Sequence, residues 1–367
     1  ECEEVMEALR KTGRLDNTLL IITGDNGDSF PRAKSNLYDL GCHVPFAVRW
    51  PGVIKPGSVC DGFVSLMDLT ATFYEAAGVK PKEKMDSRSL IPVFKGDYTA
   101  CRKEIYSDRE RHTNTRPGGY GYPMRSVQDK DFLYIRNLYP DRLPAGTDPV
   151  YGDTGHGPAK AFMVFQRDKY PKEIFDRAFG LRPAEELYDL RKDPGCLNNV
   201  ADSVSYAKTK KKMSRRLTSW MKRTSDPRVD PGNLCFDTLP YVRKAMRIAL
   251  IETEGCLKDS HGKDIDWVRA QIEKLRKQGV KVIELRAAGD LTEYVAALNN
   301  IKDQNALTGR EITLLSGTET GILAAKEAGI IPAGVTWGGT DAKTMVMSGA
   351  SYVLTNQEEL ELCLDFL

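Results

Sequence analysis

The sequence predicts an α/β chain of two main parts, each built on strands that carry polar residues at their carboxyl ends. Three observations support this prediction. A short β-branched run, 19–23, is closed by a glycine and followed by Asp-Asn; strands and helices alternate from about residue 246; and a stretch with Pro, Asp and Gly, 225–240, separates the two. With 367 residues, 41% of them hydrophobic, the chain suits two or three compact domains.

The run 19–23 is expected to form a buried parallel strand, because it is short, apolar and β-branched. Asp25 and Asn26 follow at its carboxyl end, where open α/β sheets bind ligands, and their oxygens suit Ca²⁺ or Mg²⁺. Taken alone, the triplet that ends with Gly27 favours a tight turn without a ligand, because Asn-Gly and Asp-Gly favour turns for backbone reasons. Lys34 could hold an anion beside such a cation, although an isolated lysine is usually a solvated surface charge.

Seven further blocks, in a fixed order, resemble the formylglycine-dependent sulfatases, and within them the heparan N-sulfatase (sulfamidase) branch. With the strand and the Asp-Asn-Gly triplet, the resemblance covers roughly the first 230 residues. The blocks are LYDLGCHVPFAVRWPG, VSLMDLTATFYEAAGV, SRSLIPVFKG, RERHT, YPMRSVQDKDFLYIRNLYPDR, ELYDLRKDPGCLNNVA and SWMKRTSDPR.

The resemblance implies part of an alkaline-phosphatase-like core in residues 1–100 and a small antiparallel-sheet subdomain in 101–230. It also implies that Asp25 and Asn26 ligate an active-site Ca²⁺ and that Lys34 contacts sulfate. A divalent ion and an ammonium would together stabilise charge as the bond to sulfur breaks. The implied substrate is a sulfated sugar or glycosaminoglycan, as a sulfate ester or an N-sulfamate, in an exported, periplasmic or lysosome-like compartment.

His112 and Arg125 are the expected substrate-binding residues of the C-terminal subdomain. His112 lies in RERHT, where the flanking arginines could also form a basic patch for acidic sugars, and a lone histidine could be a pH-sensitive surface group. Arg125 could clamp an anion through two parallel hydrogen bonds or serve as a structural salt-bridge partner.

The nucleophile of the family is a formylglycine made from the first residue of a C/S-x-P-x-R motif, which this sequence does not contain. The stretch 225–228, Ser-Asp-Pro-Arg, has the wrong spacing. We therefore expect the C-terminal portion of a sulfatase, inactive alone. The alternative is a non-catalytic carbohydrate- or phosphate-binding module.

A linker is expected at 231–245 and a second α/β domain at 246–367. The alternation of strands and helices implies a parallel, helix-covered sheet. The expected strands are 247–251, 280–285, 311–315, 331–336 and 351–354, and the expected helices are 265–278, 291–300, 319–328 and 341–348.

This second part resembles the haloacid dehalogenase (HAD) phosphatases through IALIETEGCLKDS and LLSGTETGILAAKEAGIIPAGVTWGG. The catalytic positions depart from that family. Glu252 and Glu254 stand where aspartates are expected, and the added methylene displaces an in-line nucleophile by a distance that can cost roughly 100-fold in rate. Gly317 and Gly321 replace metal-binding acids, and Arg286 replaces a phosphate-binding Thr or Ser.

We therefore expect a degenerate HAD-like domain, a pseudoenzyme with three possible roles: packing or interaction, binding of a phosphorylated ligand through Arg286, or weak HAD-type phosphatase activity through Glu252. Lys and Arg total 53 against 51 Asp and Glu, so the overall charge does not indicate nucleic acid. The basic run 208–216 could contact a sulfated polymer or form the solvated face of a helix. No apolar run is long enough to span a membrane.

Overall fold

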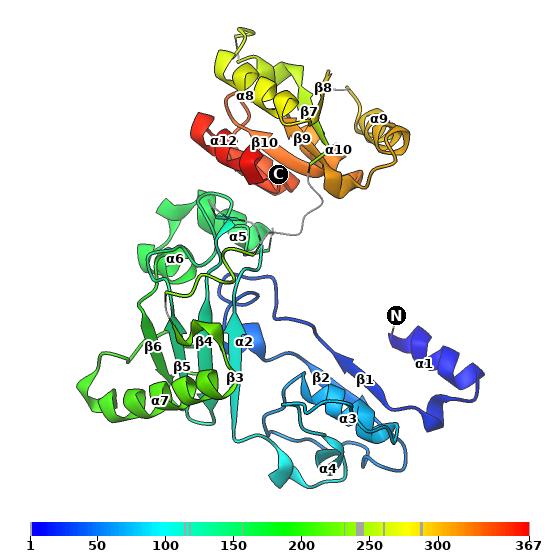
Figure 1. Ribbon diagram of the computed structural model, residues 1–367, viewed down its shortest axis with the longest axis vertical. Helices are drawn as coiled ribbons and strands as arrows, with labels where there is room; N and C mark the ends of the chain where they lie inside the picture. Colours follow the sequence, from blue (N-terminus) through cyan, green and yellow to red (C-terminus); the bar gives the residue numbers. More distant parts are fainter. Residues whose placement is uncertain are drawn as a thin grey trace.

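The computed structural model describes residues 2–113, 115–116, 119–155, 157–230, 232–239, 246–259, 261–286 and 289–366. Their strands form three sheets, of two, four and five strands. Figure 1 shows an elongated molecule with the five-stranded sheet at the top, the four-stranded sheet below it, and the two-stranded sheet to one side. Among the described residues, no helix combines the length and the apolar character needed to cross a membrane.

The N-terminal lobe, residues 2–100, surrounds the two-stranded sheet with short helices. Asp68 fixes the start of the helix at 68–76, because its buried carboxylate accepts hydrogen bonds from the backbone N–H groups of Ser65 and Arg88 and from the guanidinium of Arg102. The elements are α1 (Cys2–Lys11), η1 (Leu15–Asn17), β1 (Leu20–Thr23), α2 (Asp39–Cys42), β2 (Phe46–Arg49), α3 (Asp68–Ala76), α4 (Ile91–Phe94) and η2 (Tyr98–Ala100).

The prediction of a buried parallel strand at 19–23 is wrong in two respects. β1 pairs antiparallel with β2, from Leu20 opposite Arg49 to Thr23 opposite Phe46. It is also only half-buried, and the Ile22 side chain is 42% exposed. An apolar β-branched run favours a strand but does not encode its direction, which depends on the neighbour it finds. β2 is the one neighbour among the described residues.

The antiparallel-sheet prediction for the middle of the chain is confirmed. The four strands lie in the order β3-β4-β5-β6, every pair antiparallel. Alternate side chains serve opposite faces: Leu133 and Ile135 pack with the 24–38 segment, whereas Tyr134 packs under the long helix α7. The elements are β3 (Glu104–Arg109), β4 (Met124–Asp129), β5 (Phe132–Asn137), α5 (Pro158–Phe165), η4 (Arg167–Lys169), α6 (Lys172–Phe179), β6 (Glu185–Asp189), η5 (Val204–Tyr206), α7 (Ala207–Arg223) and η6 (Pro227–Val229).

The C-terminal part is a five-stranded parallel sheet in the order β11-β10-β9-β7-β8, as the alternating pattern predicts. Helices cover both faces, so that one core contains α8 and α12 residues and the other contains α9 and α10 residues. Its elements are β7 (Ile248–Glu252), η7 (Thr253–Leu257), α8 (Asp266–Lys277), β8 (Lys281–Leu285), α9 (Leu291–Gln304), η8 (Gly309–Glu311), β9 (Ile312–Ser316), α10 (Glu319–Glu327), β10 (Ile331–Val335), α11 (Ala342–Ser348), β11 (Tyr352–Leu354) and α12 (Gln357–Phe366).

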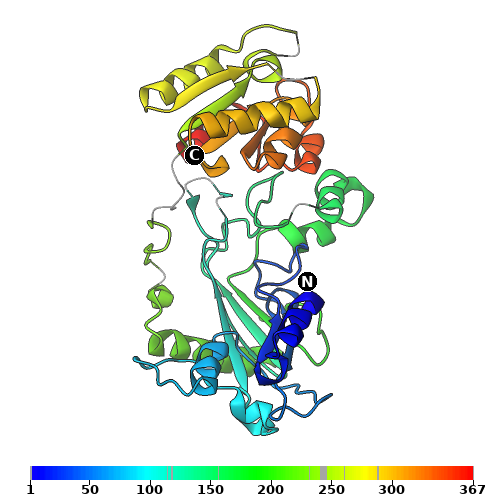
Figure 2. The same cartoon turned by 90° about the vertical axis from the view of Figure 1, so that its right-hand side faces the viewer.

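An apolar cluster joins the C-terminal part to the α5–α6 insertion between β5 and β6. Val150 and Phe165 pack against Ile322, Met345 and Val346. Figure 2 shows this contact side on, with the C-terminal part seated above the insertion.

The expected linker, 231–245, is only partly described. Pro231 and 240–245 lie outside the described residues. Residues 232–239 pack on the antiparallel-sheet part, where the buried Asp237 accepts hydrogen bonds from the Gly121 backbone N–H and from Arg228. The first half of the expected linker is therefore fixed to the preceding part.

Candidate functional site

Asp25 and Asn26 lie in a loop whose first residues pack tightly against the start of α2, which follows the loop. We call residues 24–38 the DNG loop. Asp25 is exposed and Asn26 half-buried at its start. A Cβ on Gly27 would lie 2.1 Å from the Leu40 carbonyl oxygen, so only glycine permits this approach. The turn is thereby held against the start of α2, with its two oxygen-bearing side chains directly beyond β1.

Lys34 lies in the same loop, and its backbone is bonded on both sides. Its N–H donates to the Asp28 carbonyl at 2.9 Å, and its own carbonyl accepts from Asn36 Nδ2 at 2.9 Å. The side chain is half-buried, and among the described residues no carboxylate lies within ion-pair distance of it. The structure thus brings Asp25, Asn26 and Lys34 into one loop.

Two arginines tie the DNG loop to the antiparallel-sheet part. Arg182 Nη2 donates to Asn36 Oδ1 at 2.8 Å. Arg32 Nη2 donates to the Cys196 carbonyl at 2.6 Å, and its guanidinium stacks 3.9 Å above the Tyr38 ring. Each of these two hydrogen bonds joins residues more than a hundred positions apart in the sequence, and sequence reasoning missed both.

A buried carboxylate, Glu186, fixes the end of the loop. It accepts hydrogen bonds from the Tyr38 hydroxyl at 2.7 Å, from the Tyr188 hydroxyl at 2.5 Å and from Asn137 Nδ2 at 2.7 Å. Burial raises the pKa of both tyrosines, so the two phenols remain protonated donors. Tyr38, at the end of the DNG loop, therefore packs in a rigid polar core.

His112 belongs to a cluster centred on the buried Asp153. His112 Nδ1 lies 3.3 Å from Asp153 Oδ1, and the other carboxylate oxygen binds the guanidinium groups of Arg109 and Arg116. Burial alone would raise the pKa of Asp153, but hydrogen bonds from His112 and Thr113, with the two arginine charges, hold it well below its usual range. The exposed His112 is thus held by an ionised carboxylate.

Arg125 takes the structural alternative named from the sequence. It is 2% exposed; its Nε and Nη2 bind the Asp226 carboxylate at 2.5 and 3.0 Å, and Nη2 also binds Glu110 Oε1 at 2.7 Å. The geometry does not fit a substrate clamp, because the polar edge of the guanidinium is already occupied by two carboxylates. Asp226 lies 101 residues away, so the pair is not visible in the local motif.

In the C-terminal part, Glu252 ends β7 inside a closed cage of donors. The residue is 0% exposed. Oε1 accepts from the Tyr294 hydroxyl at 2.7 Å, and Oε2 accepts from Ser316 Oγ at 2.8 Å and the Gly317 N–H at 3.2 Å. Thr318 Oγ1 lies 3.1 Å from both oxygens. Burial raises the pKa of Glu252 even though these hydrogen bonds lower it.

Gly317 and Gly321, from the second of the two HAD-like sequence blocks, leave space for the donors around Glu252. A Cβ on Gly321 would lie 2.1 Å from Glu252 Oε1, and one on Gly317 would lie 2.4 Å from the Gly255 carbonyl oxygen. Glu254 and Arg286 are exposed, and neither is among the hydrogen-bond partners of Glu252. Of the five motif positions expected from the sequence, the structure therefore brings Glu252, Gly317 and Gly321 together. Glu254 and Arg286 lie outside this cluster.

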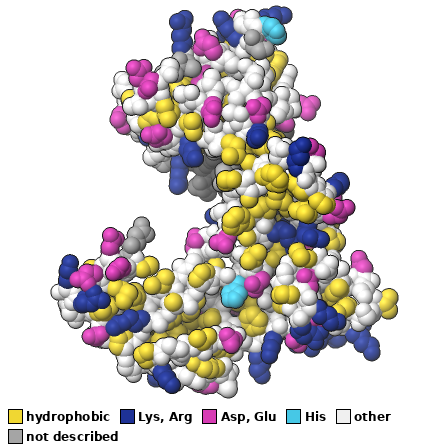
Figure 3. All heavy atoms as spheres, turned by 180° about the vertical axis from the view of Figure 1, so that it is seen from behind, with side chains coloured by type: hydrophobic (Ala, Val, Ile, Leu, Met, Phe, Trp, Pro, Cys, Tyr) yellow, Lys and Arg dark blue, Asp and Glu magenta, His cyan; other side chains and the backbone are white. Residues whose placement is uncertain are grey.

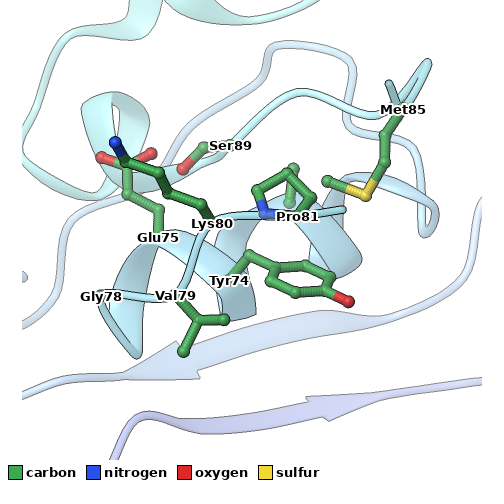
Figure 4. Close-up of a pocket in the computed structure, with 9 residues that line it drawn as sticks. Tyr74, Glu75, Gly78, Val79, Lys80, Pro81, Met85 and Ser89 are labelled. Atoms are coloured by element: carbon green, nitrogen blue, oxygen red, sulfur yellow. The ribbon is translucent and has the colours of Figure 1, made fainter. Parts of the chain in front are cut away.

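A separate hollow of about 400 Å³ lies beside the end of α3 (Figure 4). Tyr74, Pro81 and Met85 supply its larger apolar surfaces, and Lys80 and Glu75 stand at its edge. None of the site residues expected from the sequence lines it.

Residues 2–79 match the Sulfatase family. An ulvan-active sulfatase of Formosa agariphila is 33% identical over 226 residues, covering 62% of this chain and 41% of that protein. The N-sulphoglucosamine sulphohydrolase of Homo sapiens is 30% identical over 235 residues, covering 61% of this chain and 45% of that protein. The solved structure of BT4656 in complex with D-glucosamine-2-N,6-O-disulfate has a TM-score of 0.45 at 22% identity, covering 62% of this chain and 38% of that one.

The chain thus spans less than half the length of these curated relatives. The family match and the relatives support a sulfatase assignment for the part of the chain that carries the DNG loop.

Proposed function

We propose that this chain supplies the Asp-Asn-Lys side of a sulfatase active site that hydrolyses sulfate esters or N-sulfamates of sugars. The observation that carries the proposal is the Sulfatase match over residues 2–79, which includes the whole DNG loop. The loop's close glycine packing and its two arginine anchors support it, because a binding loop has to hold its polar groups in fixed positions.

Asp25 and Asn26 fit a calcium ion by donor type. A carboxylate and an amide oxygen are hard oxygen ligands, and the exposed Asp25 leaves its carboxylate available. Calcium takes about six to eight oxygens, and the described residues contain no cluster of three or more acidic, histidine or cysteine ligands. These two residues would therefore provide part of the coordination shell. When bound, the ion supplies charge neutralisation at the sulfate oxygens.

Lys34 would donate its ammonium to a sulfate oxygen. Negative charge grows on the leaving oxygen or nitrogen as its bond to sulfur breaks, so an ammonium fixed beside the sulfate group stabilises the transition state more than the ground state. The backbone bonds on either side of Lys34 restrict where its side chain can reach. The nucleophile of the family, a formylglycine, would come from a C/S-x-P-x-R motif that this sequence does not encode.

His112 is the proposed substrate contact on the antiparallel-sheet side. Its hydrogen bond to Asp153 fixes the ring, and a third of its side chain, 34%, remains exposed. The relatives named above include enzymes of ulvan and of N-sulphoglucosamine, so a sulfated sugar or glycosaminoglycan is the proposed substrate class. An exported or lysosome-like compartment is the matching proposal for location.

The test is sulfate release by the complete gene product, expressed with a formylglycine-generating enzyme. N-sulfoglucosamine and an aryl sulfate would be compared for wild type and for Lys34→Ala, with the exposed Lys55→Ala as the matched control. We expect Lys34→Ala to lose about 100-fold or more in kcat/KM and Lys55→Ala to keep its rate. Unchanged turnover in Lys34→Ala, or no release from either substrate by wild type, would overturn the proposal.

For the C-terminal part we infer a HAD-like domain without turnover. The Glu252 carboxylate is surrounded by hydroxyl and amide donors and has no exposed surface, so a phosphate ester has no path to it. This counts against weak phosphatase activity through Glu252 and leaves the packing role and ligand binding through the exposed Arg286 as the two remaining roles. In a p-nitrophenyl phosphate assay with Mg²⁺, wild type and Glu252→Gln should both match the protein-free rate. Magnesium-dependent turnover that Glu252→Gln abolishes would contradict this inference.

A further inference from the structure

The outer face of α7 carries a row of cations, which we call the α7 stripe: Lys208, Lys211, Lys212 and Arg215. All four are exposed and together line a shallow hollow of about 300 Å³. The inner face of the helix buries Met213, Leu217 and Met221 against the sheet. In Figure 3, which views the molecule from behind Figure 1, Lys and Arg side chains gather at the lower right, on the side where α7 lies.

The stripe differs from two other cations of the same helix, Lys210 and Arg216. Lys210 pairs with Glu185 at 3.3 Å and with Asp202 at 3.7 Å. Arg216 pairs with Asp129 at 2.7 Å and with Glu104 at 3.5 Å. Among the described residues, none of the four stripe cations has a carboxylate within ion-pair distance. Lys210 and Arg216 are therefore neutralised, whereas the stripe is not.

The spacing of the stripe works against the helix. Lys208 precedes Lys211 and Lys212 by three and four residues, and Arg215 follows them by four and three. Each member therefore lies beside a like charge one turn away, and such pairs destabilise a helix. They span about 10 Å along the axis at about 1.5 Å per residue. A row of unpaired positive charge of this length matches a chain of anionic groups better than a single small anion.

We propose that the α7 stripe binds a sulfated polysaccharide chain at a surface separate from the DNG loop. The choice of sulfated sugar polymer rests on the proposed function. The residues that line the hollow favour a sulfated polysaccharide over a nucleic acid or a membrane. All four are basic, and the lining has neither the aromatic side chains that stack on bases nor the apolar side chains that enter a bilayer. The sheet separates the two sites, since the core that contains Leu37 and Tyr38 lies on its opposite face.

The test measures binding by the full 367-residue chain to heparin at about 0.1 M NaCl, where charges on a surface still act over about 10 Å. The variant changes all four stripe residues to Gln. The matched control changes four scattered exposed lysines to Gln, namely Lys55, Lys80, Lys277 and Lys343. Chemically desulfated heparin and a short DNA duplex serve as alternative ligands, and thermal unfolding reports on the fold.

We expect the stripe variant to bind heparin at least about tenfold more weakly, with a shallower salt dependence, while the control stays within about twofold. Its melting temperature should equal or exceed that of wild type, because like-charge contacts are removed. Equal losses in variant and control, DNA bound as tightly as heparin, or no heparin binding by wild type would each overturn the proposal. Lys34→Ala should retain heparin binding, so this result is independent of the sulfate-release assay.

Discussion

Arg182 Nη2 donates to Asn36 Oδ1 at 2.8 Å although 146 positions separate the two residues. Asn36 in turn donates to the carbonyl of Lys34. The loop that carries the proposed sulfate contact is therefore positioned by a residue just before β6, and Arg182 acts on Lys34 through Asn36.

Arg182→Met should loosen the DNG loop. Loss of a buried charged hydrogen bond should reduce the free energy of unfolding by about 2–3 kcal/mol. Hydrogen–deuterium exchange at the amides of 33–38 should rise, whereas the exposed Arg177→Met on α6 should leave it unchanged. Equal exchange in the two variants would show that Asn36 is held by other contacts.

Asp153→Asn should destabilise the antiparallel-sheet part by about 3 kcal/mol at pH 7, because two buried guanidinium groups lose their counter-ion. Since the folded state holds the pKa of Asp153 well below normal, the carboxylate stabilises the fold above about pH 4 and loses this effect as the pH falls further. Urea unfolding from pH 3 to pH 7 should therefore show a difference from wild type that shrinks at low pH. The control is the exposed Asp202→Asn.

Glu252→Gln should change the pH dependence of the free energy of unfolding in the opposite sense to Asp153→Asn. Burial raises the pKa of Glu252 in the folded protein. As the pH rises above about 4, this side chain therefore ionises more readily in the unfolded chain than in the folded protein. Wild type consequently loses stability as the pH rises toward the folded-state pKa. The stability of Glu252→Gln relative to wild type should therefore improve as the pH rises above about 4. The exposed neighbour Glu254→Gln should not reproduce this trend, and a flat difference for Glu252→Gln would contradict the raised pKa.

Cys60 and Cys101 should form a disulfide under oxidising conditions. Their sulfur atoms lie 3.3 Å apart, beside the bridge that pairs Phe63 with Arg102. Burial and the neighbouring Cys60 raise the pKa of the Cys101 thiol to about 11, so oxidation should quicken as the pH rises. Peptide mapping without reductant should detect the linked pair, and Cys60→Ser should remove about 3–4 kcal/mol of stability from the oxidised protein. Cys42→Ser is the control.

The strands of the C-terminal part lie within about one or two residues of their predicted places, because apolar runs bounded by glycine and polar residues mark buried parallel strands well. The antiparallel sheet within 101–230 was predictable from the resemblance to the sulfatases. The antiparallel direction of β1 could not be predicted, because it depends on the strand with which β1 pairs, which is β2.

The contacts that define the sites escaped prediction because they join distant segments. Arg125 meets Asp226 across 101 residues, and Glu252 meets Tyr294 across 42 residues, with hydroxyl donors that a local motif does not specify. The sequence placed Asp25, Asn26 and Lys34 near one another because they share a loop. It could not provide Arg32, Arg182 or Glu186, which decide how that loop is held.

The contact between Gly27 and the peptide at 40–41 has a consequence for protein engineering. Gly41 is also close-packed, since a Cβ there would lie 2.3 Å from the Asn36 carbonyl oxygen. The whole stretch 24–41 therefore interlocks through its main chain, so side-chain redesign can proceed at exposed positions but the backbone cannot be shortened or spliced piecemeal. A graft of this loop onto another scaffold would have to carry all of these residues as one block.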